Sequence, residues 1–475
     1  MTLTASETTP HEPPSPPSSR RRGWFAPLLL RLHFYAGILV GPFILIAAIS
    51  GALYALTPQL EQAVYAEQLH APKTDATLTL AAQIEAADAY RGDSSGLFAV
   101  RPAPEPGDTT RIMYAEDGLG PSESRAVFVD PGTGEIRGDL VVYGTSGSTP
   151  LRTWISNLHR NLHLGDAGRL YSELAASWLG IVAIAGLALW IIRIRKARAK
   201  KDFVRPNRTH KGYRGLFGWH TTIGIWLVLG ALFLSATGIT WSQHAGTNVS
   251  NLRAALNWGT PSINTTLGVE TPAADDHAHH HGAETAPTGA ANPATFDAIL
   301  AIAQRENVNT GQVEIKPPAE PGTAWTIREI KSSFPTEGDS LAIDGTTMQV
   351  VDRIDFADLS LPAKFASWGI NIHMGVMFGL ANQIVLFLVA IALAAMVVLG
   401  YLMWWKRRPA RDTSKLVGSP PRRALRDAPW WGIATAGAIA LLIGFWLPLV
   451  GWTLLAFLVL DTVISITARQ RSSTR

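Results

Sequence analysis

The chain has 475 residues, of which 47% are hydrophobic and none is cysteine, and its formal net charge is +4. The lack of cysteine excludes disulfides, thiolate metal sites and iron–sulfur clusters, so redox chemistry would require a bound cofactor or a metal held by histidine. The basic residues gather beside long apolar runs, which is typical of membrane topology and argues against nucleic-acid binding.

The apolar residues concentrate in runs of about 18 to 25 residues, long enough to cross a hydrocarbon core of about 30 Å. They predict a polytopic α-helical membrane protein in the bacterial cytoplasmic membrane, with both termini in the cytoplasm. We expect four core spans and a C-terminal hairpin of two shorter spans, at 25–56, 170–192, 216–241, 373–405 and 429–467. The first run is too long for the core of a cleaved signal peptide, which has about 7–15 residues.

The segments between the spans differ in charge and composition. A Pro/Ser-rich tail (1–24) ends in three arginines, and a loop (193–215) and a linker (406–428) are strongly basic. Because Lys and Arg accumulate on the cytoplasmic side, these segments and the short C-terminal tail (468–475) are expected inside. The N-terminal tail is expected to be disordered.

Two polar regions, 57–169 and 242–372, are expected outside the membrane, where each would form an α+β module. Each begins with a helix-like segment, at 78–90 and 292–305, and continues with short strand-like segments. The second region carries a histidine-rich insert that could capture metal loosely or simply be solvated. The histidines of this insert are His277, His279, His280 and His281.

Histidines occur at matched positions in the two halves of the chain. His33 and His220 open the first and third spans and are 187 residues apart in the sequence. Gly51 and Gly238 are separated by the same 187 residues. Each of these two glycines follows a small hydroxyl residue. A histidine at a membrane border is costly without a partner or a ligand, so it suggests a functional site. The pattern therefore predicts a duplication with a histidine at equal depth in each half.

A second matched pair precedes the second and fourth spans. The segment Trp154-Ile155-Ser156-Asn157-Leu158-His159 corresponds to Trp368-Gly369-Ile370-Asn371-Ile372-His373. Two histidines on facing helices can ligate one haem iron from both sides. We therefore expect two haem b groups, one held by His33 and His220 near the cytoplasmic face and one by His159 and His373 near the outer face.

Other uses of these histidines remain open at this point. A border histidine can hydrogen-bond a neighbouring carbonyl, and imidazole also suits copper, zinc or iron without a porphyrin. His163, one helical turn after His159 and expected on the same face, is the reserve ligand for the outer site. It would shorten the distance between the two sites by about 6 Å.

At these positions the chain resembles the PepSY-associated transmembrane family, which includes iron-regulated membrane proteins and ferric-siderophore reductases. The resemblance covers about residues 25 to 408. It rests on Leu32-His33…Gly37, Val129-Asp130-Pro131…Thr133-Gly134-Glu135, Leu158-His159, Trp219-His220…Gly224, Thr237-Gly238 and His373-Met374-Gly375…Phe378-Gly379. It implies a four-helix haem-binding core with two PepSY-like modules. The second module has Asp344-Gly345-Thr346-Thr347 where the family shows an Asp…Thr-Gly turn, which suggests a degenerate module.

These observations and the resemblance together predict a membrane ferric-siderophore reductase that passes electrons across the bilayer. No flavin or nicotinamide motif is present, so the donor would be a separate cytoplasmic-side partner or a membrane quinol, and the acceptor a ferric chelate outside. The alternative is a non-enzymatic haem- or metal-binding sensor or regulatory partner. A transporter is a third class, disfavoured because we expect no carboxylate within the four core spans.

Overall fold

The computed structural model describes residues 24–74, 76–197, 204–206, 208–268, 291–308, 310–407 and 428–473. In this part of the chain, four helices are long and apolar enough to cross a membrane. These are α1 (Phe25–Ala55), α6 (Gly165–Lys196), α7 (Gly212–Thr240) and α11 (Gly379–Lys406). Side chains such as Ile184, Leu229 and Leu388 stay exposed on their outer faces, as contact with lipid requires. The predicted membrane protein is thus confirmed.

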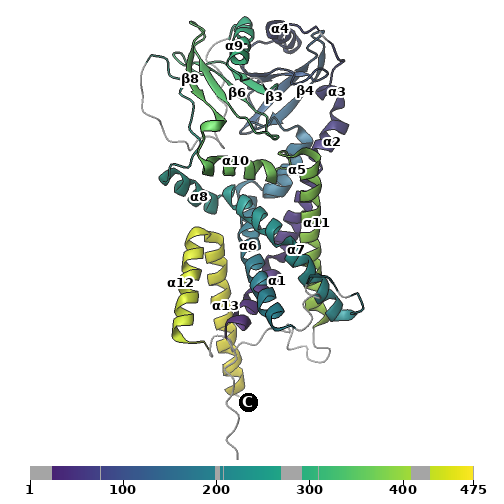
Figure 1. The fold of residues 1–475 in the computed structure, drawn as a ribbon, viewed down its shortest axis with the longest axis vertical. Coiled ribbons are helices and arrows are strands. Elements are labelled where there is room, and N and C mark those ends of the chain that lie inside the picture. The colour runs from purple at the N-terminus through teal and green to yellow at the C-terminus, as the bar shows by residue number, and fades with distance from the viewer. Residues whose placement is uncertain are drawn as a thin grey trace, which may run out of the picture.

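The four long helices form one bundle, in which α1 packs on α6 and α11, and α7 packs on the same two helices (Figure 1). Pro42 lies inside α1 and has no N–H, which would leave the carbonyl oxygen of Ile38 without its helical donor. The hydroxyl of Tyr401 on α11 donates to that oxygen at 2.6 Å. A bond between helices therefore replaces the missing bond within the helix.

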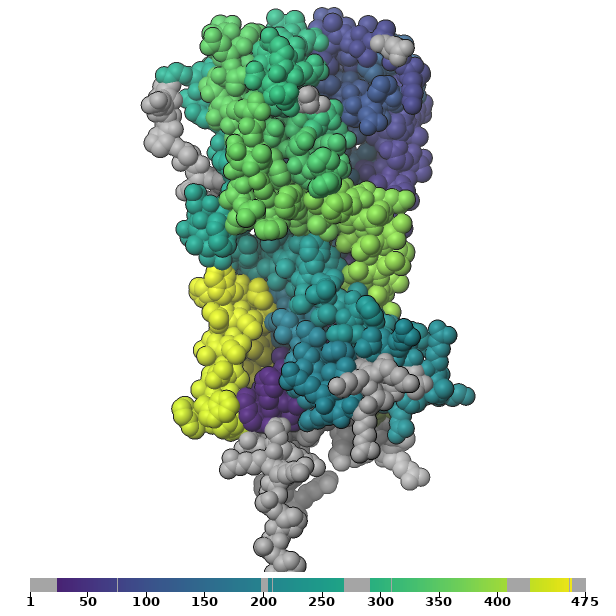
Figure 2. Space-filling view, viewed as in Figure 1, coloured from purple at the N-terminus to yellow at the C-terminus, as the bar shows by residue number. Residues whose placement is uncertain are grey.

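A hairpin of two apolar helices, α12 (Trp430–Trp446) and α13 (Pro448–Ser473), lies beside the bundle (Figure 1). Figure 2 shows this yellow hairpin against the teal of the central helices. The indole N–H of Trp178 on α6 donates to Thr453 at 3.0 Å, and Val450 is buried in the same contact. The predicted helical pair is present, and α12 is shorter than the four long helices.

A single eight-stranded antiparallel sheet stands at one end of the bundle (Figure 1). Its order is β4-β3-β2-β1-β5-β6-β7-β8, so each expected module supplies four consecutive strands. The first four are β1 (Leu97–Arg101), β2 (Thr110–Tyr114), β3 (Glu123–Val129) and β4 (Ile136–Tyr143). The second four are β5 (Val313–Lys316), β6 (Trp325–Glu329), β7 (Ser340–Ile343) and β8 (Val350–Ile354). The α+β character was predicted, whereas the joining of the two modules in one sheet was not.

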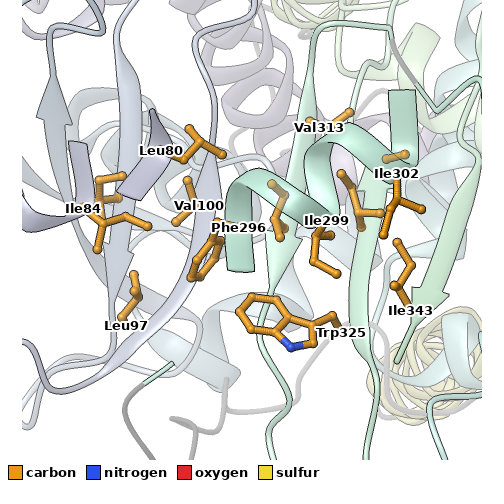
Figure 3. Packing of buried hydrophobic residues seen from close by; sticks show 14 of the residues in the cluster. Leu80, Ile84, Leu97, Val100, Phe296, Ile299, Ile302, Val313, Trp325 and Ile343 are labelled. Atoms are coloured by element: carbon orange, nitrogen blue, oxygen red, sulfur yellow. The ribbon is translucent and has the colours of Figure 1, made fainter. Parts of the chain in front are cut away.

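Helices α4 (Leu80–Arg91) and α9 (Pro293–Arg305) pack side by side on one face of this sheet. Figure 3 shows the shared core beneath them, where Phe296 of α9 meets Trp325 edge-on with ring centres 4.8 Å apart. Ile84 of α4 and Val100 of β1 are fully buried in the same cluster. The two halves therefore have one hydrophobic core rather than two.

The halves join where β1 pairs with β5, with Val100 opposite Ile315. Beside this pair, the guanidinium of Arg101 donates two hydrogen bonds to Glu314, at 2.9 and 2.5 Å. Arg328 donates to the other oxygen of Glu314 at 3.1 Å. Because Arg101 and Glu314 are both buried, each requires the other to offset the loss of water.

The expected degeneracy of the second module is wrong at the level of the fold. In the turn between β3 and β4 of the first half, Asp130 accepts the backbone N–H of Gly132 at 2.8 Å. In the corresponding turn between β7 and β8, Asp344 accepts the backbone N–H of Thr346 at 2.8 Å. Met348 takes the left-handed conformation that Gly134 takes in the first turn, with φ of 57° against 76°. An Asp side chain that caps its own turn thus preserves the geometry without the Thr-Gly sequence.

Two helices carry the chain from the sheet back to the bundle (Figure 1). Helix α5 (Pro150–Asn161) follows β4, and α10 (Leu361–His373) follows β8 and a short 3₁₀ turn (Phe356–Asp358). Three shorter helices follow the first and third long helices: α2 (Thr57–Val64), α3 (Ala66–Leu69) and α8 (His244–Ala255). Because β4 and β8 are the two edge strands, α5 and α10 follow strands at opposite edges of the sheet.

Candidate functional site

The structure brings His33 of α1 and His220 of α7 together inside the bundle. Their ring centres are 6.1 Å apart and their planes are inclined at 80°. A metal–nitrogen bond of about 2 Å on each side of one ion would place two imidazole centres roughly 6 Å apart. The spacing therefore fits two axial ligands of a single metal ion.

A backbone carbonyl fixes the proton of His33. Its Nδ1 lies 3.0 Å from the carbonyl oxygen of Val182 on α6, and this oxygen can only accept. Nδ1 therefore carries the proton, which leaves the lone pair of the neutral ring on Nε2. The carbonyl of Met396 on α11 faces His220 in the corresponding way. The Nδ1 of His220 is nevertheless buried without a hydrogen-bond partner within normal limits among the described residues.

The outer pair, His159 of α5 and His373 of α10, is held by two hydroxyls. Nδ1 of His159 lies 3.0 Å from Oγ of Ser50, and Nδ1 of His373 lies 2.6 Å from Oγ1 of Thr237. The two imidazoles are close enough to influence each other electrostatically. Ser50 and Thr237 are the hydroxyl residues of the duplicated small pairs in α1 and α7.

The proton positions in the outer pair follow from the other bonds of these hydroxyls. Ser50 donates to the carbonyl oxygen of Ile46 at 2.8 Å, and Thr237 donates to that of Phe233 at 2.7 Å. A hydroxyl has one proton, so each must accept from the histidine. Both Nδ1 atoms therefore carry protons, and both Nε2 atoms are available as ligands.

Glycines open space beside two of the rings. A Cβ at Gly51 would lie 3.1 Å from Cε1 of His159, and one at Gly186 would lie 3.0 Å from Cε1 of His33. Gly186 and Gly400 share the 214-residue offset that relates His159 to His373. The same offset relates Val182 to Met396, so both halves surround their histidines with equivalent backbone.

Comparison with protein families matches residues 30–407 to the PepSY-associated TM region. The chain belongs to the PepSY-associated transmembrane family. A comparison with curated proteins finds no match. The four histidines that the sequence singled out all lie within the matched part of this PepSY-associated protein.

His163 does not lie where the sequence predicted. Helix α5 ends at Asn161, and Leu162 and His163 both take left-handed conformations, with φ of 54° and 58°. The chain therefore leaves the helix before one more turn is complete, and the ring of His163 packs on Trp154, with centres 5.0 Å apart. His163 is exposed and is not part of the outer histidine pair.

The expectation of no carboxylate in the four core spans is also wrong. Glu173 lies in α6 and is fully buried. It accepts the backbone N–H groups of His244 and Ala245 at 2.9 and 3.0 Å, and its carboxylate lies 3.4 Å from Nδ1 of His244. This carboxylate caps the first turn of α8, which is a structural use of a buried charge.

The residues that could hold a metal form pairs rather than larger sets. Among the described residues, no group of three or more His, Asp or Glu side chains is arranged to bind an ion. The histidines of the predicted insert, His277, His279, His280 and His281, lie outside the described residues. The contacts of Ser50, Thr237 and Val182 with the histidines were not predicted from the sequence. For the two hydroxyl residues, their matched positions in the two halves could have indicated such a role.

Proposed function

We propose that this protein carries electrons across the membrane through two haem b groups and reduces a ferric chelate on the extracytoplasmic side. The observation that carries the proposal is the pairing of four partly buried histidines into two sites, with the Nε2 atoms of His33, His159 and His373 free to act as ligands. A porphyrin supplies four nitrogens, so two protein ligands complete its iron. A protein-held zinc or copper ion ordinarily requires three or four protein ligands.

The residues around each pair fit this group. The Nδ1 of His220 is unpartnered in the inner site and faces the carbonyl of Met396, which could accept its proton and leave Nε2 to a bound metal. The carbonyl of Val182 and the hydroxyls of Ser50 and Thr237 hold the other three rings in the ligating tautomer. When bound, haem supplies reversible one-electron chemistry between ferric and ferrous iron.

The chain itself positions and insulates the two sites. Apolar clusters of the bundle include Leu32 and Ile223, close to the inner pair in sequence, and α5 and α10 hold the outer pair at the sheet end. Basic loops mark the opposite end as cytoplasmic, which would place the inner pair near the donor and the sheet in the extracytoplasmic space. The membrane would be the bacterial cytoplasmic membrane.

The electron balance requires one electron for each ferric ion released as Fe(II). A membrane quinol supplies two electrons and two protons and would therefore reduce two ferric chelates, whereas a cytoplasmic-side one-electron donor would reduce one. Ferrous iron is bound far more weakly by siderophore-type chelators, so reduction releases the metal.

The test is a reduced-minus-oxidised visible spectrum of the purified protein with haem quantified per chain. We expect about two b-type haems, and His220→Ala and His373→Ala should each remove about one. Absence of haem in protein from haem-replete cells would overturn the proposal. Two haems that a ferric chelate cannot reoxidise would instead favour the non-enzymatic sensor or regulatory partner.

A further inference from the structure

A groove of about 310 Å³ lies between the edge strand β4 and helix α5, on the first half of the chain only. Its lining includes Glu123, Tyr143, Trp154, Asn157 and His163. Such a volume is at the lower end of the range for small-molecule sites, so it suits one part of a ligand rather than the whole. Helix α5 also carries His159 of the outer pair, which places the groove beside the proposed exit of the electron path.

The groove has an aromatic wall that is open to solvent. Trp154 is 53% exposed, and its ring lies tilted at 35° against that of His163. The left-handed backbone of Leu162 and His163 holds this imidazole out of the helix. Strained non-glycine residues of this kind concentrate at binding sites. Exposed ring faces favour a ligand with flat aromatic groups.

A cation lies beside the groove, next to two of its lining residues, and its guanidinium also stands over the ring of Tyr143 at 5.4 Å. Arg160 donates to the hydroxyl of Tyr143 at 3.2 Å and to Oδ1 of Asn157 at 2.9 Å, and both of these residues line the groove. Its Nε is buried without a partner, and no carboxylate of the described residues pairs with it. By contrast, nearby Arg152 pairs with Glu61. An unneutralised guanidinium favours an anionic ligand.

The second half of the chain lacks this chemistry at equivalent positions. The 214-residue offset places Met374 opposite Arg160 and Met377 opposite His163. It also places Trp368 opposite Trp154. The residues that break the repeat are therefore the cation and the imidazole, while the tryptophan is shared.

We propose that this groove is the docking site for the electron acceptor, and that it takes an anionic ferric chelate with aromatic donors of the catecholate class. Trp154 and His163 stack on a donor ring, and Arg160 binds the phenolate oxygens. Glu123 lies on the opposite strand, where its carboxylate accepts the N–H of Gly120 at 2.9 Å and orients the anionic edge toward Arg160 by repulsion. The proposal rests on the proposed function, because it assumes that the acceptor is a ferric chelate.

Binding is tested with gallium(III) tris-catecholate, which has the shape and charge of the ferric complex but cannot be reduced. Calorimetric titration of the full-length protein in detergent should show saturable binding. Arg160→Met, which copies the second half, should weaken it about tenfold or more, as should Trp154→Ala. Arg160→Lys should keep much of the affinity, since the charge is retained. Glu123→Gln should tighten binding by a few fold.

Trp368→Ala is the matched control, because it removes the equivalent tryptophan where methionines stand in place of Arg160 and His163, and it should leave the affinity unchanged. A neutral gallium tris-hydroxamate should bind about tenfold more weakly than the catecholate. Each variant is first shown to elute as wild type in size-exclusion chromatography. Equal affinity in wild type and Arg160→Met, or no binding of the gallium catecholate to wild type, would overturn the site.

The two proposals fail in distinguishable ways. If haem is present and a ferric chelate reoxidises it while Arg160→Met binds the gallium catecholate normally, the docking site is wrong and the electron-transfer function stands. If the gallium complex binds in an Arg160-dependent way but the protein holds no haem, the groove is a chelate site and the reductase function is wrong.

Discussion

At the scale of single residues, the hydroxyls of Ser50 and Thr237 hold the outer imidazoles. Each donates to its own helix and is therefore left to accept from a histidine. The same small pair in α1 and α7 was visible in the sequence as a repeat. The repeat indicated that the pair matters but not what it contacts, because the histidines it contacts are 109 and 136 residues away along the chain.

Replacing both hydroxyls, Ser50→Ala with Thr237→Val, should reduce haem at the outer site. The change leaves two buried Nδ1–H groups without acceptors and frees both rings to turn. Loss of such supporting bonds typically costs about 10- to 100-fold in metal affinity. Haem per chain after dilution into detergent measures the effect.

Thr221 provides the control for this double variant. It neighbours His220 but donates only to its own helix, at Phe217 and Gly218. Thr221→Val should retain wild-type haem content. Equal haem content in the double variant and in Thr221→Val would contradict the proposed role of the hydroxyls.

At the scale of helices, the close approach of α1 to α6 depends on Gly186. A Cβ there would meet Cε1 of His33 at 3.0 Å, whereas a Cβ at Gly400, the equivalent position on α11, would meet nothing within 4 Å. The two glycines are indistinguishable in the sequence. Their difference arises only from how tightly each helix packs.

Gly186→Val should therefore displace His33 and lose the inner haem, while Gly400→Val should be tolerated. Two methyl groups at position 186 would overlap the imidazole, and a packed bundle has little room to adjust. The haem content of the two variants, measured side by side, checks this difference. A comparable loss of haem in both variants would show that any valine in these helices lowers haem binding, and that the contact with His33 is not the cause.

Helix positions and strand segments were largely predictable, because apolar length and turn residues are local signals. The end of α5 was not. An ideal helix would have placed His163 under His159, but the left-handed Leu162 and His163 turn the chain toward α6. Leu162 and His163 themselves do not signal such an ending, since neither is glycine or asparagine, although Asn161 accepts the backbone N–H of His163 at 3.0 Å.

At the scale of the whole molecule, the seam between β1 and β5 joins the two halves. Burial alone would raise the pKa of Glu314, but the charges of Arg101, Arg328 and Lys316 outweigh burial and lower its pKa from 4.5 to about 2. Because the folded-state pKa is lowered, the stabilisation is present above about pH 4.5 and is lost as the pH falls toward 2. A shift of this size corresponds to roughly 3 kcal/mol.

We therefore expect hydrogen exchange at β1 and β5 to quicken between pH 4.5 and 2, after correction for intrinsic exchange. Glu314→Gln should weaken the seam at neutral pH by about 3–5 kcal/mol, since it leaves buried Arg101 without a counter-charge. The control is Glu116→Gln in the exposed pair with Arg125, expected to change stability by less than about 1 kcal/mol. Unchanged exchange at β1 and β5 in Glu314→Gln would refute the role of the ion pair.

The fusion of two modules into one sheet was beyond the sequence because strand pairing between distant segments leaves no local trace. Val100 and Ile315 are separated by more than two hundred residues and by two of the long helices. Each half alone has a plausible set of four strands. Only the burial of α4 against α9 over a common core shows that neither half is complete.

The pairing of β1 with β5 has a consequence for the symmetry of the molecule. Glu105-Pro106-Gly107 matches Glu320-Pro321-Gly322, an offset of 215 residues at this point, which makes Val100 the equivalent of its partner Ile315, so the two strands meet about a pseudo-two-fold axis. Such self-complementary contact is what two identical subunits make in a symmetric dimer. Each histidine pair likewise takes one residue from each half of the chain, so the two halves meet at the sheet and in the bundle as two subunits of a symmetric dimer would.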